Sequence, residues 1–411
     1  MRAIILSIGD EILNGQTINT NAAWIGKELT LLSADILYQL SIADEQAEIK
    51  RELTKATSLA DWVLITGGLG PTLDDITKKA VCDLYDVGLK FIPEVFEHVK
   101  GIFERRGREV KEVNRQQAFI PENASYLFNK RGTAPGMLIE SGKSKVVFMP
   151  GVPYEMKYIM TKHVLPRIKE EQNQVIINRH YRTAGVAESD LAERLNGIEQ
   201  RLEQVKMAYL PSPGEVKIRL TAKGSDSEDL NRRIDSLEEE MLPLLGKDLV
   251  CKGEESIAET LTLMLKERGE SIAFAESCTG GKVCAEMISI PGASEIVQGG
   301  VVSYSNQIKM QELQVKPESL EKFGAVSEQV VKEMASGCRE KFKVDYAISL
   351  SGIAGPDGGS DEKPVGTVWV GLASKHGVEA KKFQFFRNRE LNLELSTKAS
   401  LDYLRRKLKE E

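Results

Sequence analysis

The segment Ala275-Glu276-Ser277-Cys278-Thr279-Gly280-Gly281 brings hydroxyls, a thiol and two glycines together where an apolar run meets a helical pattern. At such a turn, hydroxyls and backbone N–H groups gather at a helix N-terminus, which suits an oxyanion or a phosphate. Thr279, Gly280 and Gly281 are therefore candidates for substrate binding. The alternative is structural: Ser277 and Thr279 cap the helix, and the glycines allow close packing.

Two further segments, at residues 299–309 and 349–359, carry polar groups at the ends of predicted strands. Ligands of α/β folds bind at the carboxyl ends of strands, so we expect the three segments to meet in one crevice. The alternatives are that the lysine is a solvated charge at a helix start and that the glycine-rich loop is only turn chemistry. The candidate site residues in these two segments are Tyr304, Asn306, Lys309, Ser351, Gly352 and Gly355.

Histidine-based catalysis is not favoured. None of the four histidines lies beside a serine, cysteine or carboxylate motif, so a Ser-His-Asp triad is not expected. The five cysteines are scattered without the paired spacing of a zinc site or a disulfide framework, and we expect reduced thiols.

Together, the three segments resemble the C-terminal domain of the competence- and damage-inducible protein A family, over about residues 257–408. The resemblance implies hydrolysis of nicotinamide mononucleotide to nicotinic acid mononucleotide and ammonia, without a cofactor. It also implies a serine nucleophile assisted by a lysine, with a tyrosine and a further serine or threonine nearby. Carried onto this chain, the catalytic residues are Ser277, Lys309, Tyr304 and Ser351.

The residue types fit this chemistry, because amide hydrolysis needs an activated nucleophile, a proton acceptor and donors for a tetrahedral oxyanion. With no histidine available, we expect Lys309 to be the base. Cys278, next to Ser277, is a rival nucleophile. The alternative for Cys278 is that its thiol is a small buried apolar group.

Acidic residues and glycines also follow strands predicted near the N-terminus. Glycines let a phosphate approach the backbone, and carboxylates hold hard divalent cations. The alternative is that the aspartates only cap helices. The candidates for substrate binding are Gly67, Gly68, Gly70 and Thr72, and the candidate metal ligands are Asp10, Asp74, Asp75 and Glu155.

Residues 1–170 resemble the molybdopterin-binding fold of molybdenum-cofactor biosynthesis proteins, in the version that opens the same family. That version is associated with metal-dependent ADP-ribose pyrophosphatase activity, whereas the cofactor-synthesis relatives bind a pterin. The resemblance implies a divalent metal ion (Mg, Mn or Co) held by the four acids, where it would polarise phosphoryl oxygens and activate water. Both ligands carry phosphate, so the glycine-rich loop does not separate them.

These segments require sheets covered by helices to position them. Over residues 1–165 and again after residue 255, short β-branched runs alternate with amphipathic helical stretches. The fold class that we predict is α/β, with two α/β domains of mainly parallel or mixed sheets joined by a small α+β module. Among the predicted elements are strands at Ala3–Ser7, Ile36–Ser41, Trp62–Ile65, Val146–Met149, Ser271–Ala275, Val297–Tyr304 and Tyr346–Ser351.

The joining module has the order strand, helix, two strands, helix. This βαββα order resembles a KH-type fold, but it has no Gly-x-x-Gly loop to clamp a nucleic-acid backbone, so we expect a spacer or dimerisation role. The polar stretch 246–255 is the predicted boundary before the third unit. The predicted domains are residues 1–170, 171–250 and 251–411.

Composition excludes several classes. The 411 residues, 41% hydrophobic and 28% charged, indicate several globular domains. No apolar run approaches the roughly 18–20 residues of a membrane helix, and Asp10 and Glu11 come too early for a signal peptide, so we expect a cytoplasmic protein. The net charge of −6 argues against a nucleic-acid binder. The expected partners are nicotinamide mononucleotide, ADP-ribose and a second copy of the chain in a homodimer, with no nucleic acid and no membrane.

Three functions stay open at this stage. The first is a bifunctional hydrolase of pyridine-nucleotide salvage. In the second, the N-terminal domain is a pterin- or nucleotide-binding module without turnover. In the third, the chain is an interaction protein of competence or DNA damage, against which the acidic balance weighs.

Overall fold

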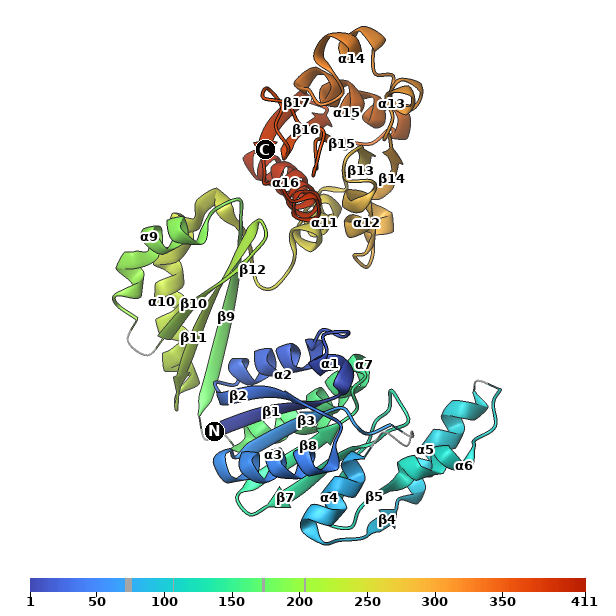
Figure 1. Cartoon of the computed structure of the whole chain (residues 1–411). Helices are drawn as coiled ribbons and strands as arrows, with labels where there is room; N and C mark the ends of the chain where they lie inside the picture. The colour runs from blue at the N-terminus through green and yellow to red at the C-terminus, as the bar shows by residue number, and fades with distance from the viewer. Residues whose placement is uncertain (71–75, 106, 172–173, 203–204) are drawn as a thin grey trace. The chain divides into compact units, whose positions relative to one another are not determined.

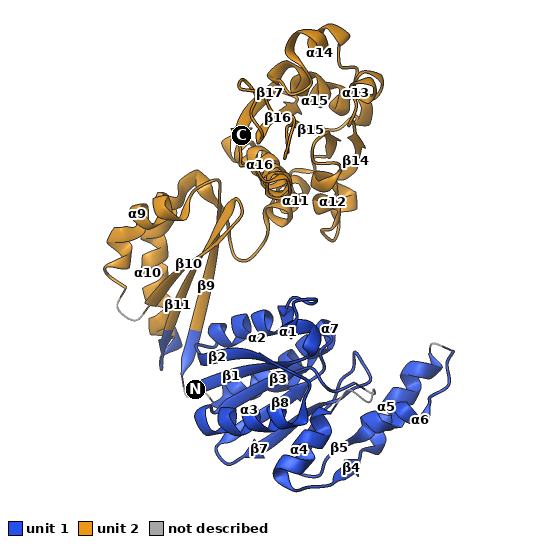
Figure 2. Ribbon diagram, viewed as in Figure 1, with its two compact units in different colours: residues 1–176, 223–227 blue, residues 177–222, 228–411 orange. Residues whose placement is uncertain are grey.

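The computed structural model describes residues 1–70, 76–105, 107–171, 174–202 and 205–411 (Figure 1). The predicted site residues Thr72, Asp74 and Asp75 lie outside the described residues. Contacts divide the chain into two compact units (Figure 2). The first is Met1–Ile176 with Lys223–Ser227, and the second is Ile177–Ala222 with Glu228–Glu411.

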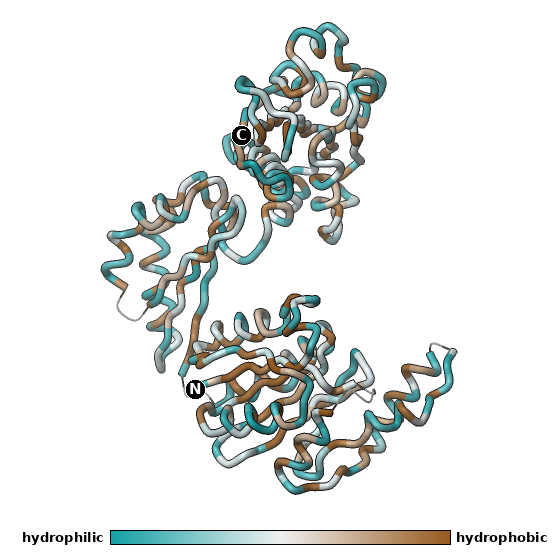
Figure 3. Tube along the Cα trace, in the orientation of Figure 1, coloured by the Kyte–Doolittle hydropathy of each residue, from teal (hydrophilic) through white to brown (hydrophobic). Residues whose placement is uncertain are grey.

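A six-stranded sheet with the order β2-β1-β3-β8-β7-β6 forms the centre of the first unit. Its first four strands are parallel, and its last two are antiparallel. The parallel strands β1 and β3 are nearly continuous apolar runs, as expected where helices cover both faces, and Figure 3 shows these strands as the most hydrophobic part of the unit. The strands are β1 (Arg2–Ile8), β2 (Asp35–Ile42), β3 (Trp62–Thr66), β6 (Ala124–Leu127), β7 (Gly136–Ser141) and β8 (Ser144–Met149).

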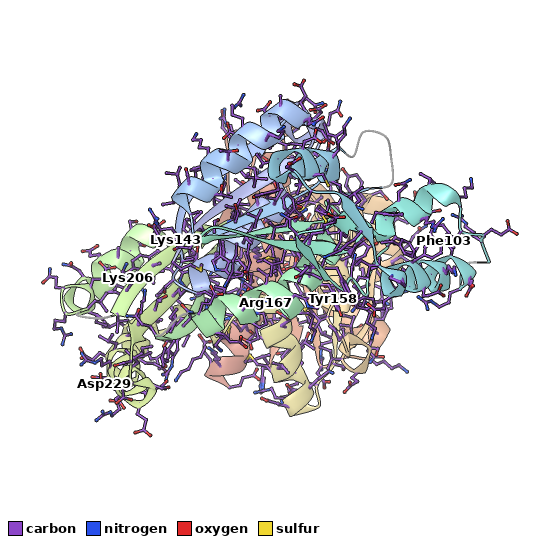
Figure 4. All side chains as sticks on the ribbon, turned by 90° about the horizontal axis from the view of Figure 1, so that it is seen from below. Phe103, Lys143, Tyr158, Arg167, Lys206 and Asp229 are labelled. Atoms are coloured by element: carbon purple, nitrogen blue, oxygen red, sulfur yellow. The ribbon has the colours of Figure 1, made fainter. Side chains whose placement is uncertain are left out.

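Helices cover both faces of this sheet. Helices α2 (Thr20–Leu31) and α7 (Pro153–Ile159) contribute to one hydrophobic cluster, and α3 (Gln46–Leu59) and α4 (Thr77–Tyr85) contribute to another. Helix α7 continues through a π-helical turn into α8 (Leu165–Glu171), and Figure 4 labels Tyr158 and Arg167 along this stretch. The remaining described elements are α1 (Asp10–Leu13), β4 (Leu89–Phe91), α5 (Pro93–Glu104), α6 (Glu112–Arg115) and β5 (Phe119–Pro121).

The second unit begins with the predicted βαββα order. The polar stretch 246–255, predicted as a boundary, also contributes a fourth strand that pairs antiparallel with β9. The prediction missed this strand because its four residues include one fully buried apolar side chain, that of Val250. The elements are β9 (Val175–Ala184), α9 (Glu188–Glu199), β10 (Val205–Ser212), β11 (Glu215–Gly224), α10 (Ser227–Leu245) and β12 (Leu249–Lys252).

The other sheet of the second unit has the order β14-β13-β15-β16-β17. Its strands are β13 (Ile272–Glu276), β14 (Val297–Val302), β15 (Tyr346–Gly352), β16 (Thr367–Ser374) and β17 (Gly377–Gln384). The first three strands in the sheet order are parallel, so their carboxyl ends lie at the same edge. The last two are antiparallel. The fold class is therefore confirmed as α/β with mixed sheets and a small α+β module.

Helices also cover both faces of this sheet. One hydrophobic cluster takes in α11, α12 and α16, and the other takes in α13 and α15. The helices are α11 (Ile257–Arg268), α12 (Lys282–Ile288), α13 (Asn306–Leu313), α14 (Pro317–Phe323), α15 (Glu328–Phe342) and α16 (Arg389–Glu410). Strand β14 ends two residues before Tyr304, where it was predicted to end. Among the described helices, none is both long and apolar enough to cross a bilayer.

Candidate active site

Ser277 begins the turn that joins β13 to α12. Its N–H donates to the carbonyl oxygen of Leu350 at 3.0 Å, which ties the turn to the neighbouring strand β15. Gly280 and Gly281 have φ angles of +65° and +98°, in the region that glycine adopts without strain. The two glycines thus let the chain turn from Ser277 into α12, which begins at Lys282. Ser277 itself is 8% exposed.

Lys309 lies within α13, which begins after Ser305. The Ser305 hydroxyl caps this helix by accepting the N–H of Ile308 at 3.2 Å. The side chain of Lys309 is 1% exposed and therefore is not the solvated charge that the sequence left open. Its Nζ lies 3.0 Å from Ser277 Oγ, 2.7 Å from the carbonyl oxygen of Ser303 and 3.4 Å from that of Tyr304.

The surroundings of Lys309 favour an uncharged amine. Burial lowers its pKa, and a smaller opposing effect comes from Cys278. Within the described chain no carboxylate forms an ion pair with Lys309. A neutral amine has two N–H groups and one lone pair. The two carbonyl oxygens can accept the N–H groups, which leaves the lone pair facing the Ser277 hydroxyl.

Cys278 also borders this site. Burial raises the pKa of its thiol to about 12, so the thiol stays protonated near neutral pH. Because the thiolate is the nucleophilic form, Cys278 is a poor nucleophile here, and Ser277 is the better one.

A cavity of about 290 Å³ opens beside these groups. Four predicted catalytic residues and one predicted binding residue line it, with Tyr304 at the rim because its side chain is 67% exposed. The lining residues are Ser277, Cys278, Tyr304, Lys309, Ala325, Val326, Ser351, Gly352, Ala354 and Arg389. The other predicted binding residues do not line the described cavity: Thr279, Gly280, Gly281, Asn306 and Gly355.

Two features of the cavity wall complete the site. The Ser351 hydroxyl donates to the carbonyl oxygen of Ala325 at 2.8 Å, which holds the segment before α15 against the end of β15. Arg389, the first residue of α16, was missed by the sequence analysis. Its guanidinium donates to the carbonyl oxygen of Gly355 at 3.0 Å, and within the described chain it has no carboxylate partner. Only the fold brings it to the cavity, since 80 residues separate it from Lys309.

A second cavity, of about 440 Å³, lies at the carboxyl ends of β1, β3 and β8 in the first unit. The predicted residues Gly67, Gly68, Gly70 and Glu155 line it. A Cβ on Gly67 would lie 2.0 Å from the carbonyl oxygen of Ile8, and one on Gly68 would lie 2.0 Å from a Thr77 oxygen. Both positions therefore require glycine, and the loop backbone borders the cavity directly.

Of the four acids predicted to hold a metal, the structure describes Asp10 and Glu155, and only Glu155 lines this cavity. Asp10 accepts the N–H of Asp44 at 3.4 Å and is not among the residues that line this cavity. Glu155 is 8% exposed and accepts from the Asn129 amide at 2.6 Å, and burial raises its pKa. In the described parts of the chain, no three histidine, cysteine or acidic residues form a group that could hold a metal ion. The described residues thus do not form a ligand set by themselves.

Comparisons with known proteins place this architecture in a class. Three family models match, described as "Probable molybdopterin binding domain" over residues 4–170, "Damage-inducible protein CinA KH domain" over 178–250 and "CinA C-terminal domain" over 254–408. In chain order, the sequence is thus similar to a molybdopterin-binding domain, a CinA KH domain and a CinA C-terminal domain.

Full-length relatives identify the family. A CinA-like protein from Cytophaga hutchinsonii is 42% identical over 99% of this chain and 98% of its own, and one from Chloroherpeton thalassium is 41% identical over 98% and 99%. The chain belongs to the CinA family. A solved structure of a competence or damage-inducible protein from Enterobacter asburiae matches 38% of this chain and 99% of its own chain, at 35% identity and a TM-score of 0.36.

Proposed function

We propose that the CinA C-terminal domain hydrolyses the amide of nicotinamide mononucleotide to give nicotinic acid mononucleotide and ammonia. The observation that carries the proposal is the 3.0 Å separation of Lys309 Nζ and Ser277 Oγ at the wall of a cavity. A nucleophile within hydrogen-bond reach of a base is the arrangement that acyl transfer requires. The family resemblance supplies the substrate.

In the first half of the reaction, neutral Lys309 accepts the hydroxyl proton of Ser277 while Ser277 Oγ forms a bond to the amide carbon. The electron pair of the carbonyl moves onto oxygen and gives a tetrahedral oxyanion. The carbonyl then re-forms and the C–N bond breaks. The proton held by Lys309 passes to the leaving nitrogen, which departs as ammonia and leaves an ester on Ser277.

In the second half, water attacks the ester and Lys309 accepts a proton from it. The C–O bond to Ser277 breaks, and the serine oxygen takes the proton back, so that nicotinic acid mononucleotide is released and the enzyme is regenerated. Burial of the lysine serves both halves, because only an uncharged amine can accept a proton from the hydroxyl and from water.

Arg389 offers a place for the phosphate of the substrate. It lies on the cavity wall, and its charge is not neutralised by a described carboxylate. A guanidinium binds phosphate through paired, charge-assisted hydrogen bonds. A mononucleotide bound in this way presents its amide to the Ser277 side of the cavity.

The test of this proposal is product analysis with the purified full chain. Nicotinamide mononucleotide should be converted to nicotinic acid mononucleotide with one ammonia released per turnover. The Ser277→Ala chain, with the same melting temperature, should release none. If Ser277→Ala retains the wild-type rate, Ser277 is not the nucleophile.

We propose further that the first unit hydrolyses ADP-ribose, which makes the chain a bifunctional hydrolase of pyridine-nucleotide salvage. The observation that favours this second activity is the 440 Å³ cavity bordered by Gly67 and Gly68. Neither of these two positions has room for a side chain. A glycine backbone can give N–H groups to a diphosphate. Gly67 already donates its N–H to the carbonyl oxygen of Met149 at 3.0 Å, so in this proposal the role falls to Gly68. Among the described residues, Asp10 and Glu155 do not by themselves form a metal site.

Direct measurements distinguish ADP-ribose hydrolysis from two alternative functions. Release of AMP from ADP-ribose, with added Mg²⁺, Mn²⁺ or Co²⁺, distinguishes turnover from a pterin- or nucleotide-binding module without turnover. A gel shift with DNA at moderate salt tests the interaction protein of competence or DNA damage. Binding of DNA without either hydrolysis would contradict both proposed activities.

A further inference from the structure

The carboxylate of Glu276 is buried directly before the nucleophile. Its side chain is 1% exposed, and in the described part of the chain no cationic side chain forms an ion pair with it. Burying a charge is costly unless it is compensated. The buried carboxylate of Glu276, beside the reactive serine, therefore needs hydrogen-bond donors in place of a cation.

Backbone N–H groups supply the compensation. The two carboxylate oxygens accept the N–H of Gly281 at 2.9 Å, that of Val283 at 3.1 Å and that of Cys284 at 2.8 Å. These groups belong to the end of the glycine turn and the first turn of α12. The Glu276 side chain, at the end of β13, is thus hydrogen-bonded to the start of α12. These bonds hold the two ends of the turn that carries Ser277 together.

The main chain of Glu276 reaches the base as well. Its carbonyl oxygen accepts the N–H of Ser303 at 2.7 Å, and the carbonyl oxygen of Ser303 in turn lies 2.7 Å from Lys309 Nζ. The side chain of Glu276 therefore fixes the turn that carries the nucleophile, and its backbone fixes the segment that holds the base.

We propose that Glu276 is a positioning residue, which sets the Ser277–Lys309 geometry by holding the glycine turn through its buried carboxylate. The proposal rests on the proposed role of Ser277 as nucleophile. A glutamine at this position could not replace the carboxylate, because its single oxygen must serve three N–H groups while its NH₂ points at a donor.

The test measures Ser277 reactivity with and without the proposed substrate, in the full chain. One readout is kcat and KM for nicotinamide mononucleotide. The other is the rate at which an alkyl fluorophosphonate forms a Ser277 O–P bond with loss of fluoride, for which Ser277→Ala is the blank. Glu276→Gln should lower both kcat and the labelling rate about 100-fold, as expected for a small displacement of the reacting groups, with KM little changed.

Glu259→Ala is the matched control. Glu259 caps α11 in the same domain by accepting the N–H of Ser256 at 2.6 Å, and it does not line the cavity. This variant should lower the melting temperature without changing either rate. Glu276→Asp, which keeps the charge but is one methylene shorter, also should lose both rates, and it replaces Glu276→Gln if that chain does not fold.

Wild-type labelling and kcat in a folded Glu276→Gln or Glu276→Asp chain would overturn the positioning role. If the wild-type chain is labelled at Ser277 but does not turn over nicotinamide mononucleotide, only the proposed substrate is wrong, and the labelling rates still decide the role of Glu276. If the wild-type chain is neither labelled nor active, both proposals are overturned.

Discussion

Lys309 Nζ lies 3.0 Å from Ser277 Oγ, although 32 positions separate the two residues along the chain. They follow the ends of the adjacent parallel strands β13 and β14. Main-chain carbonyl groups hold each of them: Ser277 N–H donates to the carbonyl oxygen of Leu350, and Lys309 Nζ donates to the carbonyl oxygen of Ser303. The sheet, rather than the local sequence, sets their separation.

Replacing Lys309 tests its role as base. Both Lys309→Ala and Lys309→Arg should lower kcat by about 100- to 10,000-fold, because arginine keeps the charge but does not give up its proton. If the lysine only attracts the substrate phosphate, Lys309→Arg should retain kcat and change mainly KM. Steady-state kinetics of both variants beside Ser277→Ala separate these cases.

The pH dependence of the wild-type chain follows from the same group. Burial lowers the pKa of Lys309, and the neutral amine is the active form. kcat should therefore rise as pH rises through this lowered pKa and should be lost as pH falls below it. A profile of kcat against pH that is flat through the acidic range would contradict the assignment of Lys309 as base.

Cys278 should be dispensable for turnover. Since burial raises the pKa of its thiol to about 12, thiol-directed reagents should inactivate the chain slowly at neutral pH. Cys278→Ala should keep most of kcat and lose about 1 kcal/mol of unfolding free energy from the removed buried atom. Loss of turnover as complete as in Ser277→Ala, in a folded Cys278→Ala chain, would contradict this expectation.

The sequence was informative wherever a periodic pattern was long. The seven parallel strands that were predicted are all present, and their bounds differ from the prediction by one or two residues at the ends. Strand β12 was missed, because four residues with one fully buried apolar side chain give no alternation to read. Strands β4, β5, β6 and β7 were also not predicted. β4 and β5 have three residues each, and the residues of β6 and β7 do not alternate strictly between buried and exposed.

The site was predictable only in part. Ser277 and Lys309 follow strand ends, and parallel strands bring such positions together. Asn306 is the first residue of α13, three positions before Lys309, and does not line the cavity, so closeness along the segment was not enough to identify a lining residue. Arg389 carries no local signal, since its place beside Gly355 depends on the return of α16 across the sheet.

Arg389 gives a prediction about substrate recognition. Arg389→Ala should raise KM for nicotinamide mononucleotide about 10- to 100-fold, the equivalent of one charge-assisted hydrogen bond, with a smaller change in kcat. The matched substrate is nicotinamide riboside, which lacks the phosphate. Its kcat/KM should be unchanged by the substitution, and an equal loss with both substrates would show that Arg389 does not bind the phosphate.

Chelation should separate the two proposed activities. The Ser277–Lys309 reaction transfers protons between a hydroxyl, an amine and the substrate, so ammonia release should persist in excess chelator. AMP release from ADP-ribose should stop and should return when Mg²⁺, Mn²⁺ or Co²⁺ is added back. Loss of ammonia release on chelation, in a chain whose circular dichroism is unchanged, would contradict the Ser–Lys assignment.

The C-terminal domain should remain active when it is expressed alone. All the groups proposed for deamidation lie after residue 253, so a fragment of residues 253–411 should keep kcat. Its stability should be lower than that of a fragment that starts at residue 246. The reason is Arg405, which is fully buried and whose guanidinium donates to the carbonyl oxygens of Leu249 at 2.8 Å and Lys247 at 2.9 Å.

Cutting at residue 253 removes both acceptors and leaves two donors of Arg405 without their protein partners. At about 1 kcal/mol for each hydrogen bond, the fragment 246–411 should melt about 4–8 °C above the fragment 253–411. Arg405→Met is the matched control, because without the guanidinium the two fragments should differ less in melting temperature. Equal melting temperatures of the unsubstituted fragments would show that these bonds contribute no stability. An inactive but folded fragment 253–411 would place part of the deamidation site outside this domain.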